Sequence, residues 1–342
     1  MTRVKKAADI KCGVVGYGGA FNMGRGHLED MRQAGMTPVA VAEIDPSRLA
    51  VAEKDFPGIE TYSSVSEMLK KSDVNLITII TPHNSHAKLA LQCLKAKRHV
   101  VCEKPLAITT AECDAMIAAA RKHGVMLSTF HNRHWDGHIM EAMKHIRAGA
   151  IGEVVRVDVA TGGWGKPGDW WRSSKTISGG LLYDWGVHLL EYTLQVVDSE
   201  ITEVTGYLKS GIWASQTRWK KDTNEDDGLV VVRYKSGAWS TMAISSIENR
   251  QNPWFKVTGT KGTYLMEWGH GEIITHRGDE TVTVRVPNQE GEDWRFYQNI
   301  ADHLVKGAKL IITPEWARRP IHIIDLACQS ARKGQALKAR YR

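Results

Sequence analysis

Asp184 and His188 stand four residues apart in the segment 178–192, SGGLLYDWGVHLLEY. Two side chains at this spacing on a helix project side by side, so the carboxylate can orient the imidazole and stabilise its charged form. Imidazole titrates near neutral pH, which suits it to moving a proton in catalysis. The alternative is a solvated polar face, because charged side chains ordinarily lie on helix surfaces. The surrounding elements must decide between the two.

The pair lies in a predicted helix that follows two glycines, Gly179 and Gly180. The apolar residues of this helix recur at spacings of three and four, as on one helix face. They are Leu182, Trp185, Leu189, Leu190 and Val196.

The first half of the chain alternates short apolar strands with helical stretches. Strands are predicted at residues 10–16, 38–44, 75–80 and 99–104, each flanked by turn residues. One helix is predicted after Ser85, and another begins at Thr109, whose hydroxyl can form a capping box with Glu112. This βαβ rhythm predicts a doubly wound parallel sheet, covered by helices on both faces.

A glycine-rich segment, GYGGAFNMGRGH, follows the first strand at residues 16–27. Glycines are needed where a strand turns into a helix and the backbone approaches a pyrophosphate at the helix N-terminus. Gly16, Gly18 and Gly19 fit this need, but the third position of the G-x-G-x-x-G pattern falls on Phe21. Gly24 supplies a later glycine, so we expect a longer phosphate loop.

The second strand ends at Glu43, 27 residues after Gly16, near the usual place of the acid that binds the adenosine ribose. A carboxylate there repels a 2′-phosphate, which favours NAD over NADP. Arg48 nearby leaves that preference open.

Two polar segments follow the fourth and fifth strands: TPHNSH at residues 81–86 and CEKP at residues 102–105. Ligands of open parallel sheets bind at the carboxyl ends of the strands. Lys104, which precedes a proline, is held in an extended or turn geometry that can direct its ammonium into a cleft. A lone lysine is otherwise an ordinary surface residue. The residues predicted to contact the cofactor are Gly16, Gly18, Gly19, Ala20, Phe21, Glu43, Thr81, Pro82, His83, His86, Glu103 and Lys104.

Beyond Phe130 the rhythm changes to strands with few helices between them. They are predicted at residues 153–161, 201–209, 228–234, 238–247, 255–259 and 262–267. We therefore predict a Rossmann domain over residues 1–130 and an α+β domain over residues 131–342, with C-terminal helices that can pack back on the first domain. The large, mostly antiparallel open sheet of the second domain carries the Asp184 helix on one face. Its other face needs a cover, which predicts a homodimer or homotetramer. Near the end, Thr313-Pro314 predicts a helix start and Pro320 a second helical segment.

Together these motifs resemble the Gfo/Idh/MocA family, the glucose–fructose oxidoreductase and inositol dehydrogenase group. The resemblance rests on the glycine loop, Glu43, the Thr81-Pro82 turn with His86, the Glu103-Lys104-Pro105 motif and the GGLLYDWGVH block, and it covers nearly the whole chain. It implies a nicotinamide cofactor, a sugar or polyol substrate, and an active site lined by Lys104, Asp184 and His188.

Oxidising a secondary alcohol needs a base near the hydroxyl and a cation for the developing alkoxide. His188 suits the first role and Lys104 the second or a share of the proton, while Asp184 fixes the geometry; the sequence does not decide which of Lys104 and His188 takes the proton. Aromatic faces can stack on sugar rings, and basic side chains can bind hydroxyls or a carboxylate. The residues predicted to bind substrate are Arg133, Trp170, Trp171, Arg172, Lys175, Asp184 and His188. A loop packed by its own aromatics is the alternative for residues 162–180, and His134 shares the position of Arg133 at the domain crossing.

Composition narrows the classes of function. The net charge of +7 is spread along the chain rather than gathered in a block, so we expect no nucleic-acid partner, while an acidic substrate stays possible. The five widely spaced cysteines form no zinc-ligand pattern, so we expect no metal. No apolar run is long enough to span a membrane and no signal peptide is evident, which predicts a cytoplasmic protein.

Three functions remain open at this point. The first is an NAD-dependent dehydrogenase acting on a ring hydroxyl of a sugar, cyclitol or sugar derivative. The second is an NAD-dependent glycosidase that oxidises C3 transiently, eliminates the C1 substituent and adds water, with no net redox change. The third is a cofactor sensor or scaffold without turnover. The sequence names neither the sugar nor whether the cofactor is retained between turnovers.

Overall fold

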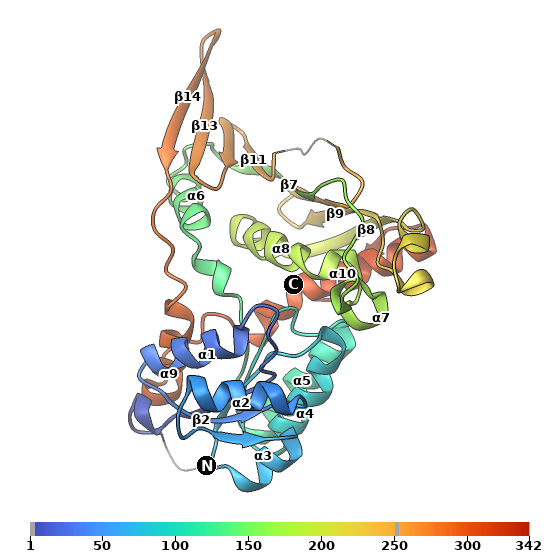
Figure 1. The fold of residues 1–342 in the computed structure, drawn as a ribbon. Coiled ribbons are helices and arrows are strands. Elements are labelled where there is room, and N and C mark those ends of the chain that lie inside the picture. The colour runs from blue at the N-terminus through green and yellow to red at the C-terminus, as the bar shows by residue number, and fades with distance from the viewer. Residues whose placement is uncertain (1–3, 250–252, 342) are drawn as a thin grey trace. The chain divides into compact units, whose positions relative to one another are not determined.

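The computed structural model describes residues 4–249 and 253–341. The chain divides into two compact units (Figure 1). The N-terminal unit contains Met1–His131 and Trp294–Arg318, and the C-terminal unit contains Asn132–Asp293 and Arg319–Arg342. The assignment of residues 131–342 to substrate binding and oligomerisation stays a prediction.

The N-terminal unit is built on a six-stranded sheet with the order β3-β2-β1-β4-β5-β6. Every neighbouring pair is parallel, which confirms the predicted Rossmann sheet. The order reverses between β1 and β4, so their carboxyl ends flank the topological switch point. The strands are β1 (Lys11–Val15), β2 (Thr37–Ala42), β3 (Glu60–Tyr62), β4 (Leu76–Ile79), β5 (His99–Cys102) and β6 (Leu127–Thr129).

Helices connect these strands and bury their apolar faces. The helix at Thr110 begins as predicted, since Thr109 and Glu112 form the capping box. Helices α4 and α5 pack against each other, and α1 packs against α9, which returns to this unit from late in the chain. The helices are α1 (Met23–Gln33), α2 (Pro46–Asp55), α3 (Val65–Lys71), α4 (His86–Lys95), α5 (Thr110–His123) and α9 (Arg295–Lys306).

The C-terminal unit is built on a nine-stranded sheet with the order β14-β13-β12-β11-β7-β10-β9-β8-β15. Among its described strands only β10 and β7 pair in parallel, so the predicted mostly antiparallel sheet is confirmed. The strands are β7 (Val154–Gly162), β8 (Ile201–Lys209), β9 (Asp227–Tyr234), β10 (Trp239–Ser245), β11 (Phe255–Gly259), β12 (Gly262–Met266), β13 (His270–Arg277), β14 (Glu280–Pro287) and β15 (Leu337–Lys338).

The sequence prediction missed the hairpin of β13 and β14. Arg277 pairs with Glu280 across a two-residue turn, in which Gly278 has φ +62°. The alternation of Thr and Val at 281–284 beside a Gly-Asp turn is a hairpin signal. Most of β14 is exposed, so its residues lack the apolar run by which the other strands were found.

Helix α8 (Trp185–Val196) covers one face of this sheet and is buried along nearly its whole length. A Cβ at Gly186 would lie 3.1 Å from Cε of Met242 and 3.2 Å from Cδ1 of Ile244, so glycine permits close packing on β10. The helix was predicted to begin directly after Gly179 and Gly180. Instead a short 3-10 turn (Leu181–Tyr183) precedes it, after Gly179 and Gly180 with φ of +95° and +128°.

The C-terminal unit also contains α6 (Gly137–Arg147) and the single turn α7 (Lys175–Ser178). The expectation that Pro320 opens a separate helical segment is wrong: α10 (Pro314–Lys333) continues through it. Proline removes one backbone donor and costs about 3 kcal/mol in a helix interior. The fully buried stripe of Ile321, Ile324 and Ala327 offsets that cost.

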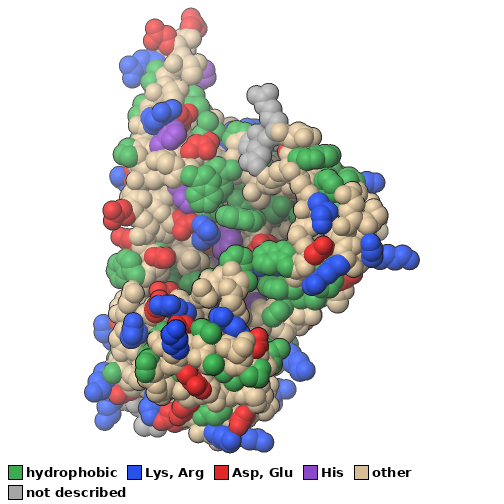
Figure 2. Space-filling view, in the orientation of Figure 1, with side chains coloured by type: hydrophobic (Ala, Val, Ile, Leu, Met, Phe, Trp, Pro, Cys, Tyr) green, Lys and Arg blue, Asp and Glu red, His purple; other side chains and the backbone are tan. Residues whose placement is uncertain are grey.

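Lys and Arg side chains alternate with Asp and Glu on the face seen in Figure 2, in agreement with the spread of charge along the sequence. Within the described residues, we find no helix that has both the length and the apolar character to cross a bilayer.

Candidate active site

The loop between β1 and α1 leaves space where a ligand would need it. Gly16 has φ +99°, and a Cβ there would lie 2.3 Å from the carbonyl oxygen of Ile80. Around Gly18, by contrast, no heavy atom of any residue other than its two chain neighbours lies within 4 Å of the Cβ position. A Cβ at Gly24 would lie 2.9 Å from the carbonyl oxygen of Gly16, so this later glycine allows α1 to pack on the turn. These are the needs of a backbone that approaches a pyrophosphate.

Glu43 and Arg48 both bind the glycine loop. Glu43 Oε2 accepts a hydrogen bond from the Tyr17 amide at 2.6 Å, while Oε1 accepts from the amides of Ile44 at 2.7 Å and Asp45 at 3.1 Å. The Arg48 Nε donates to the Tyr17 carbonyl at 2.8 Å. The Glu43 carboxylate and the Arg48 guanidinium thus lie where the adenosine ribose is expected. This pair is compatible with either NAD or NADP.

His86 joins the loops after β4 and β5. Its ring is buried, with Nδ1 2.8 Å from the Pro105 carbonyl oxygen and Nε2 2.8 Å from that of Thr81. Burial lowers the pKa of His86, although the two carbonyl oxygens oppose that shift. Both ring nitrogens are therefore engaged with backbone, a geometry that suits positioning of the loops. Thr81 and Ser85 add a hydroxyl pair at 2.6 Å in the first loop, where His83 is also buried.

A buried polar network underlies Lys104. Glu103 Oε2 accepts a hydrogen bond from the Lys104 amide at 2.9 Å, and its Oε1 lies 3.1 Å from Nε2 of His27. His27 Nδ1 lies 2.7 Å from the Tyr297 hydroxyl, which is 3.1 Å from the Thr78 hydroxyl. Burial raises the pKa of Glu103, but His27 and Lys104 outweigh it and hold that pKa below its usual value.

The sequence analysis missed His27, Thr78 and Tyr297 as members of this network. His27 is the last residue of the glycine segment, and Thr78 is a polar residue in an apolar strand. Both features could have indicated a polar role for these residues. Tyr297 lies on α9, 219 residues after Thr78, and no local sequence pattern predicts its place in the network.

In the C-terminal unit, Asp184 and His188 lie in different surroundings. Asp184 precedes α8 and its Oδ1 accepts a hydrogen bond from Nη1 of Arg172 at 2.5 Å. His188 is 6% exposed, and its ring lies 5.8 Å from that of Trp185. A solvated face is therefore wrong for His188. The structure brings Asp184 together with a second predicted residue, Arg172.

Two cationic side chains hold the loop of residues 162–180. Arg172 stacks on tryptophan rings, and Lys175 forms an ion pair. The Arg172 guanidinium lies 4.9 Å from the Trp171 ring centroid and 5.3 Å from that of Trp170. Lys175 pairs at 2.5 Å with Glu225, whose side chain is 2% exposed and also accepts from the Leu181 amide. Lys175 thereby ties the loop to the segment before β9.

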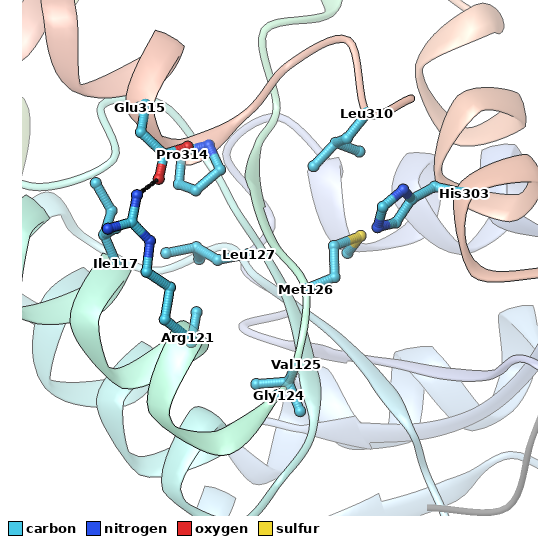
Figure 3. Close-up of a pocket in the computed structure, with 11 residues that line it drawn as sticks. Ile117, Arg121, Gly124, Val125, Met126, Leu127, His303, Leu310, Pro314 and Glu315 are labelled. Atoms are coloured by element: carbon cyan, nitrogen blue, oxygen red, sulfur yellow. Dashed lines mark hydrogen bonds and ion pairs between the residues drawn. The ribbon is translucent and has the colours of Figure 1, made fainter. Parts of the chain in front are cut away.

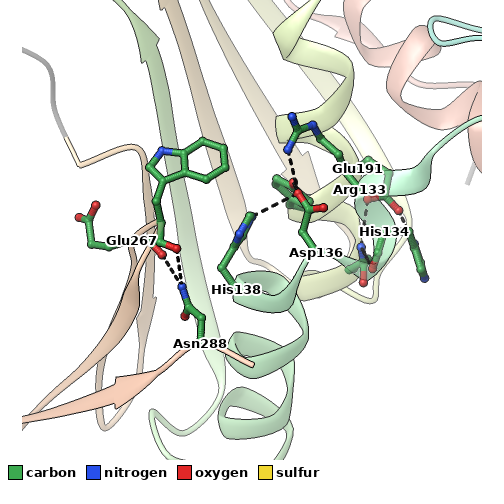
Figure 4. Close-up of polar contacts among 10 residues, drawn as sticks. Arg133, His134, Asp136, His138, Glu191, Glu267 and Asn288 are labelled. Carbon is green, nitrogen blue, oxygen red and sulfur yellow. Dashed lines mark hydrogen bonds and ion pairs between the residues drawn. The ribbon is translucent and has the colours of Figure 1, made fainter. Parts of the chain in front are cut away.

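Arg133 lies beside the start of α8, since its guanidinium is 5.1 Å from the ring centroid of Trp185, and Figure 4 shows its ion pair with Asp136. Its Nη1 is 2.9 Å from Oδ2 of Asp136, which also accepts from the Tyr192 hydroxyl at 2.6 Å. Burial and the nearby Asp136 carboxylate raise the pKa of Tyr192 well above its ordinary value. His134 lies 2.5 Å from the buried carboxylate of Glu191 on α8. Arg133 and His134, the two predicted residues of the crossing segment, are thus each held by a carboxylate.

A pocket of roughly 210 Å³ lies elsewhere in the N-terminal unit (Figure 3). It is bounded by Ile117, Met126 and Leu127, with an ion pair between Arg121 and Glu315 at its rim. None of the predicted site residues lines it. Across the described parts of the chain, no group of three or more His, Cys, Asp or Glu side chains is placed to hold a metal ion.

Two family profiles match the chain. Residues 10–131 match the oxidoreductase family with an NAD-binding Rossmann fold, and residues 139–265 match the GFO/IDH/MocA C-terminal domain.

Individual proteins are similar over most of the chain. The scyllo-inositol 2-dehydrogenase (NADP(+)) of Bacillus subtilis strain 168 is 24% identical, with 97% of each chain covered. The myo-inositol 2-dehydrogenase of Thermotoga maritima is 28% identical, with 74% of each chain covered. The crystal structure of an NAD-binding protein from Listeria innocua superposes with a TM-score of 0.81 at 27% identity, over 96% of each chain.

Proposed function

The chain belongs to the GFO/IDH/MocA family of NAD-binding oxidoreductases, and we propose that it oxidises a secondary ring hydroxyl of a cyclitol, sugar or sugar derivative. The observation that carries this proposal is the open glycine loop with Glu43 bound to its backbone. The names of the two inositol dehydrogenases support the substrate class.

The residues of the β1–α1 loop fit a dinucleotide. Gly18 offers open space for a pyrophosphate, and α1, which follows this loop at Met23, carries a partial positive charge at its N-terminus that suits a phosphate. Glu43 would accept hydrogen bonds from the ribose hydroxyls, and Arg48 would donate to a 2′-phosphate. When bound, the nicotinamide ring supplies the acceptor for a hydride.

The remaining chemistry falls to residues of the chain. His188 takes the proton of the substrate hydroxyl, and the Lys104 ammonium stabilises the alkoxide that develops as hydride leaves. The reverse assignment of these two roles is the open alternative. Asp184 and Arg172 hold each other at 2.5 Å, so each fixes the other's direction beside α8. Glu103 and His27 position the backbone that carries Lys104.

The test is a spectrophotometric assay with NAD and NADP across a panel of inositols, monosaccharides and aryl glycosides. A stoichiometric rise at 340 nm with an inositol or sugar supports the proposal. Phenol released from an aryl glycoside in deuterated water, with deuterium at C2 and no net rise at 340 nm, would instead indicate the redox-neutral glycosidase. Cofactor binding without either signal would favour a sensor.

We also propose that the open face of the nine-stranded sheet forms a dimer or tetramer contact in a cytoplasmic protein. Tyr207 and Leu229, which pair between β8 and β9, are 61% and 36% exposed, and apolar surface of this kind favours burial. Light scattering after size exclusion should give a dimer or tetramer for the wild type and smaller species for Leu229→Glu. A monomeric wild type would end this proposal.

A further inference from the structure

A row of aromatic rings extends from the proposed base. The ring of His188 lies 5.8 Å from that of Trp185, which is 6.3 Å from that of Trp268. Trp268 in turn stacks on Trp254, with centroids 4.7 Å apart and planes inclined by 5°. We call Trp185, Trp254 and Trp268 the tryptophan row.

The tryptophan row is held in place yet open to a ligand. His138 lies edge-on to both Trp254 and Trp268, at 5.2 Å from each. The Asn288 side-chain amide donates to the Trp268 carbonyl at 3.0 Å and to that of Glu267 at 2.8 Å, which fixes the turn after β12 (Figure 4). Trp268 nevertheless remains 56% exposed. A rigid, accessible indole is suited to stacking, since little conformational entropy is lost on binding.

The polar groups beside the tryptophan row carry compensating charges. The Arg133 guanidinium lies 5.1 Å from the Trp185 centroid and 6.0 Å from that of Trp268. Its charge is matched by Asp136 at 2.9 Å. A carboxylate ligand would meet Asp136 as well as Arg133, so it gains little net attraction. The guanidinium has five N–H donors, enough to serve hydroxyl groups in addition to Asp136.

We propose that the tryptophan row, with Arg133 and Asp136, binds a second, uncharged sugar ring joined glycosidically to the ring that is oxidised. This inference rests on the proposed function for the position of the first ring at His188. The C–H face of a pyranose would lie on the indole of Trp268, and its hydroxyls would bind the Arg133–Asp136 pair. An apolar peptide would offer no acceptor to the remaining N–H donors of Arg133, whereas sugar hydroxyls provide one.

The experiment is isothermal titration of the NADH-loaded enzyme with glucose, cellobiose, maltose and an aldobiouronic acid. At least one neutral disaccharide should bind about tenfold more tightly than glucose, the gain from burying one apolar ring face. The aldobiouronic acid should bind less tightly than that neutral disaccharide.

Trp268→Ala should bring the ratio of disaccharide to glucose affinity close to one. Trp239→Ala is the matched control, because Trp239 also lies beneath an arginine, Arg156, that pairs with an aspartate. Trp239 is on the sheet face opposite α8, so the ratio should stay at the wild-type value, with the elution volume on size exclusion checked in parallel.

Equal affinity of the wild type for glucose and every disaccharide would overturn the inference, as would tightest binding of the aldobiouronic acid. Retention of the affinity ratio in Trp268→Ala would do the same. These outcomes differ from failure of the proposed function, which would show as the absence of NADH formation even with a sugar bound.

Discussion

The loops at the carboxyl end of the parallel sheet and the start of α8 differ in how deeply their polar side chains are buried. Behind Lys104, the side chains of Glu103, His27 and Tyr297 are largely buried and bind one another. Beside α8, Arg172, Asp184 and Arg133 are partly exposed and form ion pairs at the surface of their unit. The first arrangement supports the fold as well as the site, whereas the second directs groups outward.

This difference has a physical consequence for substitutions. A buried group that loses its partner carries its full desolvation cost, about 1–3 kcal/mol. A partly exposed ion pair that is broken is resolvated, and its contribution to stability is about 0–1 kcal/mol. Changes behind Lys104 should therefore reduce stability and activity together, while changes to the ion pairs beside α8 should reduce activity with a smaller loss of stability.

The largest effect is expected from His188→Gln. Loss of a general base lowers turnover by about 10²- to 10⁴-fold. Cofactor affinity should be retained, because the proposed cofactor residues all lie in the N-terminal unit. Steady-state kinetics and fluorescence titration with NADH measure the two quantities. A variant with normal turnover would remove His188 from the mechanism.

Lys104→Ala should follow, with a loss in turnover of about 10²- to 10³-fold from removing one alkoxide-stabilising group. Lys88→Ala is the control, since Lys88 is an exposed lysine on α4 of the same unit. The melting temperatures of both variants should match that of the wild type. If Lys88→Ala lost as much activity as Lys104→Ala, a general effect of surface charge would explain both.

His27→Leu tests the buried network. It leaves Glu103 and the Tyr297 hydroxyl each short of a partner, so the free energy of unfolding should fall by about 1–3 kcal/mol. Turnover should fall as well, because the Lys104 backbone loses its support. Urea unfolding gives the first quantity, and Tyr297→Phe, which leaves His27 Nδ1 and the Thr78 hydroxyl each short of a partner, should show a similar loss. Unchanged stability in His27→Leu would contradict the network's role.

The last prediction concerns the pH dependence of stability rather than turnover. Burial, with the nearby His303, lowers the pKa of His99 to about 4, and its Nδ1 accepts a hydrogen bond from the Met126 amide. Between the unfolded pKa of about 6.5 and the folded value, the unfolded chain binds more protons, so stability falls as pH falls. His99→Asn keeps an acceptor but cannot titrate. Its unfolding free energy should vary less between pH 6.5 and 4, and an unchanged slope would contradict this account.

The sequence was most informative where partners are set by topology. Residues after adjacent parallel strands share one sheet edge, so the loops at Thr81 and Glu103 could be placed near each other in advance, and the structure joins them through His86. The acid at Glu43 was found by its distance from the glycine loop. These relations need only strand order and spacing.

It was least informative where partners come from remote segments. Nothing near Asp184 indicates that Arg172 pairs with it, and nothing near Lys175 indicates Glu225, 50 residues later. The tryptophan row was missed for the same reason, since Trp185 precedes Trp254 and Trp268 by more than 60 residues. Such contacts follow from how the loops of the C-terminal unit pack, which the sequence pattern does not fix.

The most direct test of the central claim is the rate of hydride transfer in a single turnover, followed at 340 nm after NAD-loaded enzyme is mixed with its substrate. This rate would be compared between the wild type, Lys104→Ala, His188→Gln and the double variant. If both residues act on the same hydroxyl, the double variant should lose about as much rate as the more damaged single variant. Losses that multiply, or a double variant that still reduces NAD at the wild-type rate, would contradict a site built from these two residues.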